Sequence, residues 1–68
     1  MIVALNGRPA TLPDGATVAD AVKEVGVDRE VRGIAVAVDG EVVRRSDWPN
    51  TRLASDQIIE VVRAVQGG

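Results

Sequence analysis

Short apolar runs separated by turn dipeptides dominate the chain and predict a fold rich in β-strands. The first run, "MIVALNG", ends in Asn6-Gly7, a dipeptide favoured in two-residue hairpin turns because both central residues take positive φ. The returning strand is then "RPATLP". Because Pro9 has no N–H to donate to a ladder, we expect this second strand at an edge of the sheet.

A helix is predicted over "TVADAVKEVG", after a turn at "DG". Thr17 is a suitable N-cap, Asp20 places an anion in the first turn, and Gly26 is a suitable left-handed stop. The apolar residues follow the i, i+3, i+4, i+7 spacing of one helix face: Val18, Ala21, Val22 and Val25. This helix therefore lies with one side against another layer.

Alternating residues predict a second hairpin and a final strand. In "IAVAVDGEVV", Ile34, Val36 and Val38 alternate with small residues, Asp39-Gly40 turns the chain, and residues 41–44 return. The last run, "QIIEVVRAVQ", predicts the longest strand and continues directly into Gly67 and Gly68.

The predicted order is β-β-α-β-β-β, which indicates an α+β fold in one domain over residues 1–68. A β-grasp arrangement fits this order, with a mixed sheet of four to five strands packed on one helix. The first and last strands should then lie parallel and adjacent in the middle of the sheet.

The two faces of the final strand can be separated by their side chains. Glu60 should point away from the helix, because burying an unpaired carboxylate is costly. We therefore expect Ile59 and Val61 in the core with Val3, Leu5, Val18, Val22, Val25, Ile34, Val36 and Val38. The outward side then carries Ile2, Ala4, Ala35, Ala37, Ile58, Val62 and Ala64. This is either a docking surface or a surplus of apolar residues on an open sheet.

Composition excludes several function classes. Cysteine and histidine are absent, which removes disulfides, thiol nucleophiles, Cys/His zinc sites and the commonest general base. The net charge of −2, with a single aromatic residue, argues against nucleic-acid binding. No apolar run approaches the roughly 20 residues of a membrane span, so a cytoplasmic protein is expected. The acidic residues lie mainly at turns and at the helix start, and we predict neither a catalytic dyad nor a metal site.

Several strings resemble the sulfur carrier proteins of thiamine thiazole biosynthesis, a ubiquitin-like β-grasp family. The resemblance lies in "AVAVDGEVVRRSDW", in the closing "IIEVVRAVQGG", and in the layout of "LPDGATV" and "TRLAS". It covers essentially the whole chain. Two turns depart from the family pattern: "SDQ" stands where a Gly-Asp pair is usual, and Val43-Arg44-Arg45 lacks the common proline.

This resemblance implies that the chain is a protein co-substrate rather than an enzyme, and that it needs no cofactor. The Gly68 carboxylate would be adenylated by a ubiquitin-activating-type adenylyltransferase, receive sulfur from a donor such as a cysteine desulfurase, and pass it to thiazole synthase. A side-chain-free end at Gly67 and Gly68 can enter a narrow site. The partner-binding residues expected are Ile2, Ala4, Ile58, Val62, Ala64, Val65 and Gln66.

Alternatives remain open from the sequence. One alternative is another double-glycine carrier, such as the small subunit of molybdopterin synthase or a ubiquitin-like modifier, which shares the fold and the terminus. Another is a β-grasp interaction domain, in which the tail has no role. Trp48 either caps the core, which we favour, or contacts a partner. Arg44 and Arg45 are either solvated surface charges next to a turn, which we favour, or they bind an acidic or phosphate group of a partner.

Overall fold

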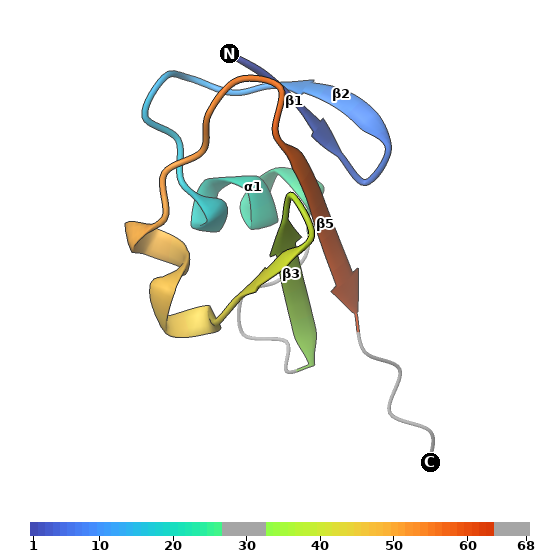
Figure 1. Ribbon diagram of the computed structural model, residues 1–68, viewed down its shortest axis with the longest axis vertical. Coiled ribbons are helices and arrows are strands. Elements are labelled where there is room, and N and C mark those ends of the chain that lie inside the picture. The colour runs from blue at the N-terminus through green and yellow to red at the C-terminus, as the bar shows by residue number, and fades with distance from the viewer. Residues whose placement is uncertain (27–32, 64–68) are drawn as a thin grey trace.

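The computed structural model describes residues 1–26 and 33–63 of the chain. Over these residues the strands and the α-helix follow the predicted order, β-β-α-β-β-β (Figure 1). A short 3-10 helix, which the sequence did not predict, precedes the last strand. In chain order the elements are β1 (Ile2–Leu5), β2 (Arg8–Thr11), α1 (Val18–Val25), β3 (Ile34–Val38), β4 (Glu41–Val43), η1 (Arg45–Asn50) and β5 (Ile58–Arg63).

The five strands form one mixed sheet in the order β2-β1-β5-β3-β4. β1 and β5 are parallel neighbours, with Ala4 opposite Ile58, and the remaining pairs are antiparallel. The predicted parallel pairing of the first and last strands is therefore confirmed. Pro9 lies in the edge strand β2, where its missing N–H leaves no gap in the ladder.

Both hairpins turn as their dipeptides predict. Asn6 and Gly7 have φ values of 52° and 80°, and Asp39 and Gly40 have 50° and 86°. Two consecutive positive φ values are the signature of the two-residue turn that matches the twist of the flanking strands. Asparagine and aspartate tolerate this backbone better than other residues with a side chain.

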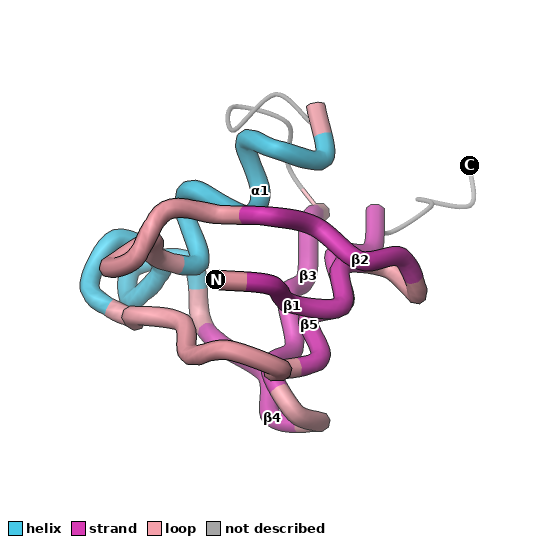
Figure 2. Tube along the Cα trace, turned by 90° about the horizontal axis from the view of Figure 1, so that it is seen from above, coloured by secondary structure: helices cyan, strands magenta, loops and turns pink. Residues whose placement is uncertain are grey.

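Helix α1 covers one face of the sheet, as the view from above shows (Figure 2). Its N-terminus has a complete capping box: the Thr17 hydroxyl accepts from the Asp20 N–H, and the Asp20 carboxylate accepts from the Thr17 N–H at 2.8 Å. Gly26 ends the helix with a φ of 84°. The predicted apolar stripe faces the sheet, with Val25 only half-buried at its end.

The core lies between α1 and the sheet and contains the residues predicted for it, although Val25 and Ile34 are only half-buried at its margin. The prediction missed Leu12, Ala16 and Leu53, which lie in connecting segments and are also buried. The Leu53 N–H donates to the Ala16 carbonyl at 2.9 Å, so the segment before β5 lies along the start of the helix. That long-range pairing brings both side chains into the core.

Trp48 lies in η1 and is 3% exposed, so the core-capping interpretation is confirmed. Its indole N–H donates to the Val43 carbonyl at 2.9 Å, which satisfies the polar atom of the ring. The Arg45 guanidinium lies 5.3 Å from the ring centroid, within the range of a cation–π contact. The Trp48 side chain of η1 therefore links β4 to the core, because the ring is buried and bonds the Val43 carbonyl.

Candidate functional site

Strand β5 runs along the centre of the sheet and leads toward the double-glycine end. Its side chains alternate between the two faces as predicted. Ile59 and Val61 are 0% and 8% exposed on the helix side, whereas Ile58 and Val62 are each 54% exposed on the other side. Glu60 is exposed on that same outer side, so its carboxylate stays in water.

An apolar patch covers the outer face of the sheet. The register places Ala4 opposite Ile58, and Ala35 opposite Val62, on neighbouring strands. The predicted Ile2 belongs to this face and is 56% exposed. We define the outer-face patch as the residues Ile2, Ala4, Ala35, Ala37, Val42, Ile58 and Val62.

Val42 is the patch residue that the sequence interpretation missed. It is 77% exposed and lies opposite Ala37 in the β3–β4 hairpin. The signal was present in the sequence, because a two-residue turn at Asp39-Gly40 fixes this pairing and puts directly opposed residues on one face. The patch therefore extends across β4 to the edge of the sheet.

A shallow hollow of about 270 Å³ adjoins the patch at the β1–β2 end. Its lining includes Ile2, Ala4 and Pro9, with Arg8 and Asp56 supplying both signs of charge. An apolar floor with charged groups beside it is the usual composition of a protein-binding surface.

Two turn residues hold β5 from opposite sides. In the β1–β2 turn, Asn6 accepts from the Val61 N–H through Oδ1 at 2.7 Å and donates to the Val61 carbonyl through Nδ2 at 3.2 Å. In the β3–β4 turn, Asp39 accepts from the Ile58 N–H at 2.9 Å and from the Gln57 side-chain amide at 3.3 Å. The sequence assigned both residues to turns only, because a contact with a distant strand leaves no local signal.

Comparison with known proteins identifies the family. The model of the ThiS family matches residues 3–68, which is nearly the full chain. The chain belongs to the ThiS family. The sulfur carrier protein ThiS of Thermus thermophilus is 36% identical over 67 residues, a match that spans 98% of this chain and all of the relative.

Solved ThiS-family structures confirm the ubiquitin-like β-grasp fold. The crystal structure of the thiamine biosynthesis protein ThiS from Geobacter metallireducens superposes with a TM-score of 0.80 at 23% identity, and the match covers both chains completely. An NMR structure of a thiamine biosynthesis protein from the same organism gives a TM-score of 0.77 at 23% identity, covering all of this chain and 88% of the other.

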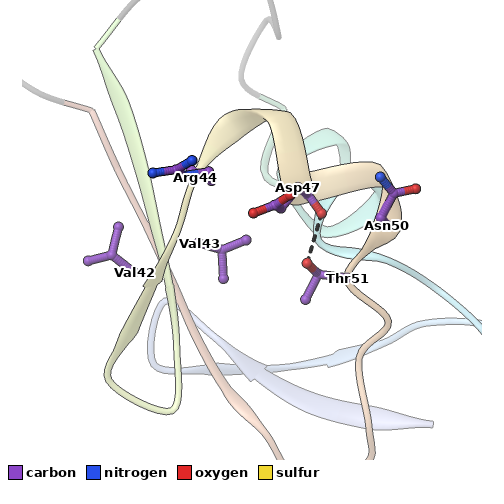
Figure 3. A pocket seen from close by; sticks show the side chains of 6 residues that line it. All are labelled: Val42, Val43, Arg44, Asp47, Asn50 and Thr51. Atoms are coloured by element: carbon purple, nitrogen blue, oxygen red, sulfur yellow. Dashed lines mark hydrogen bonds between the residues drawn. The ribbon is translucent and has the colours of Figure 1, made fainter.

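A second concave region lies between β4 and η1 and shares Val42 with the outer-face patch (Figure 3). This cleft has a volume of about 600 Å³ and is lined by Val42, Val43, Arg44, Asp47, Asn50 and Thr51. The Thr51 hydroxyl donates to the Asp47 carbonyl at 2.7 Å and closes the last turn of η1. Arg44 and Asp47 thus both border an open cleft of mixed polarity.

Other predicted site residues of this ThiS-family chain lie outside the described part of the structure. These are Ala64, Val65, Gln66, Gly67 and Gly68. The prediction that residues 66–68 are either mobile or extended beyond the last ladder hydrogen bond also falls on this part of the chain. Within residues 1–26 and 33–63, no cluster of three or more acidic side chains could hold a metal ion. Over the same residues, α1 and η1 are both too short to cross a bilayer.

Proposed function

We propose that this protein is a sulfur carrier in thiamine thiazole biosynthesis, that residues 1–68 act as one carrier domain, and that the Gly68 carboxylate is the reacting group. The observation that carries the proposal is the match of the ThiS family model through to residue 68, which includes the double glycine. The relative from Thermus thermophilus bears the name of a sulfur carrier protein.

The proposed chemistry takes place on enzymes that act on the tail. An adenylyltransferase of the ubiquitin-activating type would let the Gly68 carboxylate attack the α-phosphorus of ATP, forming an acyl-adenylate and releasing pyrophosphate. The terminal sulfur of a persulfide on a donor such as a cysteine desulfurase would then displace AMP and form an acyl disulfide. A second thiol would reduce this acyl disulfide, leaving a thiocarboxylate on Gly68 and a disulfide on the donor. Because this series of reactions consumes ATP, we propose that the protein acts in the cytoplasm.

Glycine at the last two positions suits this role. A buried adenylation site must bring the ATP phosphates within bonding distance of the chain end, and a residue without a side chain permits the closest approach. A side chain at Gly67 or Gly68 would occupy that space. The domain itself supplies a reactive end and a surface by which it is held.

The outer-face patch is the surface that we propose the adenylyltransferase and thiazole synthase contact. It contains four exposed large apolar residues, Ile2, Val42, Ile58 and Val62, and β5 connects it directly to the tail. Water contact with so many apolar side chains is unfavourable, and a partner that covers them gains their burial. The partner contacts proposed for Ala64, Val65 and Gln66 continue this surface along the sequence.

The test is a reconstituted adenylation and sulfur-transfer reaction with the adenylyltransferase, ATP, a sulfur donor and thiazole synthase. With wild-type protein, the adenylation reaction should release pyrophosphate from ATP. The protein should then acquire a thiocarboxylate and support thiazole formation. Deletion of Gly68, or addition of one residue after it, should abolish the thiocarboxylate while leaving the melting temperature unchanged, since neither change alters a residue of the core between α1 and the sheet. A thiocarboxylate on the extended chain without trimming would refute the role of Gly68.

A second arm separates carriers of the same fold. If the thiocarboxylated protein delivers sulfur to molybdopterin synthase and not to thiazole synthase, the thiazole assignment is wrong while the carrier role stands. If the chain becomes conjugated to lysine side chains of other proteins, it is a modifier instead.

A further inference from the structure

We propose that Asn6 is a positioning residue for the reactive tail: its side-chain amide extends β1 by one peptide unit and holds the C-terminal half of β5 in the sheet. This inference rests on the proposed function, because it concerns how the strand presents the chain end. Asn6 acts through Val61 and touches no reacting atom.

The contacts of Asn6 reproduce a parallel ladder. β1 ends at Leu5, opposite Ile59, and the Asn6 backbone N–H still donates to the Ile59 carbonyl at 2.9 Å. In a regular parallel pair, the residue that donates to position 59 accepts from the N–H of position 61 through its own carbonyl. Asn6 has a φ of 52° because the chain turns there, and the acceptor for the Val61 N–H is instead its side-chain Oδ1, at 2.7 Å.

The second half of the amide completes the pattern. Nδ2 of Asn6 donates to the Val61 carbonyl at 3.2 Å, where the next peptide N–H of a longer β1 would have donated. A primary amide carries the same donor and acceptor as a peptide group. Aspartate at this position would keep the acceptor and lose the donor.

This contact matters because of where β5 goes. On its other side β5 is paired with β3 as far as Arg63, opposite Ile34. On the β1 side, backbone pairing ends at Ile59, and among the described residues only the Asn6 amide bonds the Val61 backbone there. Without it, β5 beyond Ile59 would be held by β3 alone, and we expect its last residues to separate from the sheet more often.

Fraying would lengthen the part of the chain between the last paired residue of β5 and Gly68. The effective concentration of a tethered group falls roughly as the −3/2 power of the flexible length once the tether exceeds the span it must bridge. The Gly68 carboxylate would therefore occupy the adenylation site less often, even with the domain fully bound. The expected effect is a lower rate at saturation, with unchanged docking.

The molecule offers a matched control in Asp39. Asp39 also has a positive φ, also precedes a glycine in a two-residue turn, and also bonds a β5 amide through its side chain. Its contact is with Ile58, at the opposite end of the strand from the tail. Asn6→Gly and Asp39→Gly both create a Gly-Gly turn and both remove hydrogen bonds to β5.

The experiment compares these two variants with wild type in two measurements. Amide hydrogen exchange followed by NMR reports the Val61 N–H, and single-turnover adenylation over a range of adenylyltransferase concentrations separates the saturating rate from the half-saturating concentration. Asn6→Gly should raise Val61 exchange by about tenfold. It should lower the saturating rate by up to about twofold at an unchanged half-saturating concentration. Asn6→Asp should give a smaller rise in exchange.

Asp39→Gly should lower the melting temperature by a similar amount and leave both Val61 exchange and the saturating rate at their wild-type values. Equal losses of rate in the two variants would show that only stability matters and would overturn the proposal, as would unchanged Val61 exchange in Asn6→Gly. If wild-type protein is not adenylated at all, the proposed function fails. The exchange rate of the Val61 N–H then tests by itself whether the Asn6 side chain keeps β5 paired.

Discussion

The sharpest prediction from the two faces of β5 is that Val62→Asp abolishes partner binding while the domain stays folded. Val62 is 54% exposed, so about half of its burial remains to be gained in a complex. Full burial of a valine side chain contributes about 1.5–3 kcal/mol, so replacing the half-exposed Val62 removes roughly 1 kcal/mol of binding free energy. Desolvating the introduced carboxylate costs at least about 2 kcal/mol more. Together this predicts at least a roughly hundredfold weaker Kd.

Folding should change little in this variant. A surface substitution usually alters stability by about 0.5 kcal/mol, and the lower strand propensity of aspartate adds up to about 1 kcal/mol. The melting temperature should therefore fall by no more than about 10 °C. Val61→Asp is the matched contrast, because Val61 is 8% exposed and faces the core. Burying a neutral polar group without a hydrogen bond costs about 2–7 kcal/mol and burying an ionised carboxylate costs more, whereas a domain of this size has roughly 3–10 kcal/mol of stability.

The assay pairs thermal unfolding, followed by circular dichroism, with titration calorimetry against the adenylyltransferase. Lys23→Glu changes a charge on the exposed side of α1 and should leave binding intact. Wild-type affinity in folded Val62→Asp would refute the docking role of the outer-face patch. Unfolding of Val62→Asp, together with a folded Val61→Asp, would show that the faces of β5 are assigned wrongly.

Three further predictions concern stability, and each is read from a melting curve. Thr17→Ala removes the N-cap that bonds Asp20 and should cost about 1 kcal/mol; an unchanged melting temperature would contradict the capping role. Trp48→Phe loses the hydrogen bond to the Val43 carbonyl and should cost about 1–3 kcal/mol. Ile59→Val should cost about 0.5–1.5 kcal/mol because Ile59 is fully buried, and a neutral effect would argue against its place in the core.

Features determined by neighbouring residues were predictable from the sequence. The turns at Asn6-Gly7 and Asp39-Gly40, the capped helix and the alternation of β5 depend on residues within a few positions of one another. The β-grasp topology followed because the order of elements leaves few ways to pair the first and last strands. The same alternation placed the predicted patch residues of β1, β3 and β5 on the outer face.

Features that depend on distant contacts were not predictable. Leu12, Ala16 and Leu53 have no periodic neighbours, and their burial follows from the pairing of two loops far apart in sequence. η1 includes Pro49, and proline marks turns and loops more often than helices. Asn6 forms part of a turn through its backbone and bonds a distant strand through its side-chain amide. Only the turn has a pattern that can be recognised in the sequence.

The most direct test of the carrier role is thiol alkylation of the protein purified from its own cells, read by tandem mass spectrometry. The chain contains no cysteine, so a thiol-selective reagent can report only an acquired sulfur. Locating the label also separates a thiocarboxylate from oxidation of Met1, which changes the mass by nearly the same amount. The account predicts one alkyl group per labelled chain, at Gly68. An unlabelled Gly68 carboxylate in cells that are actively making thiazole would contradict it.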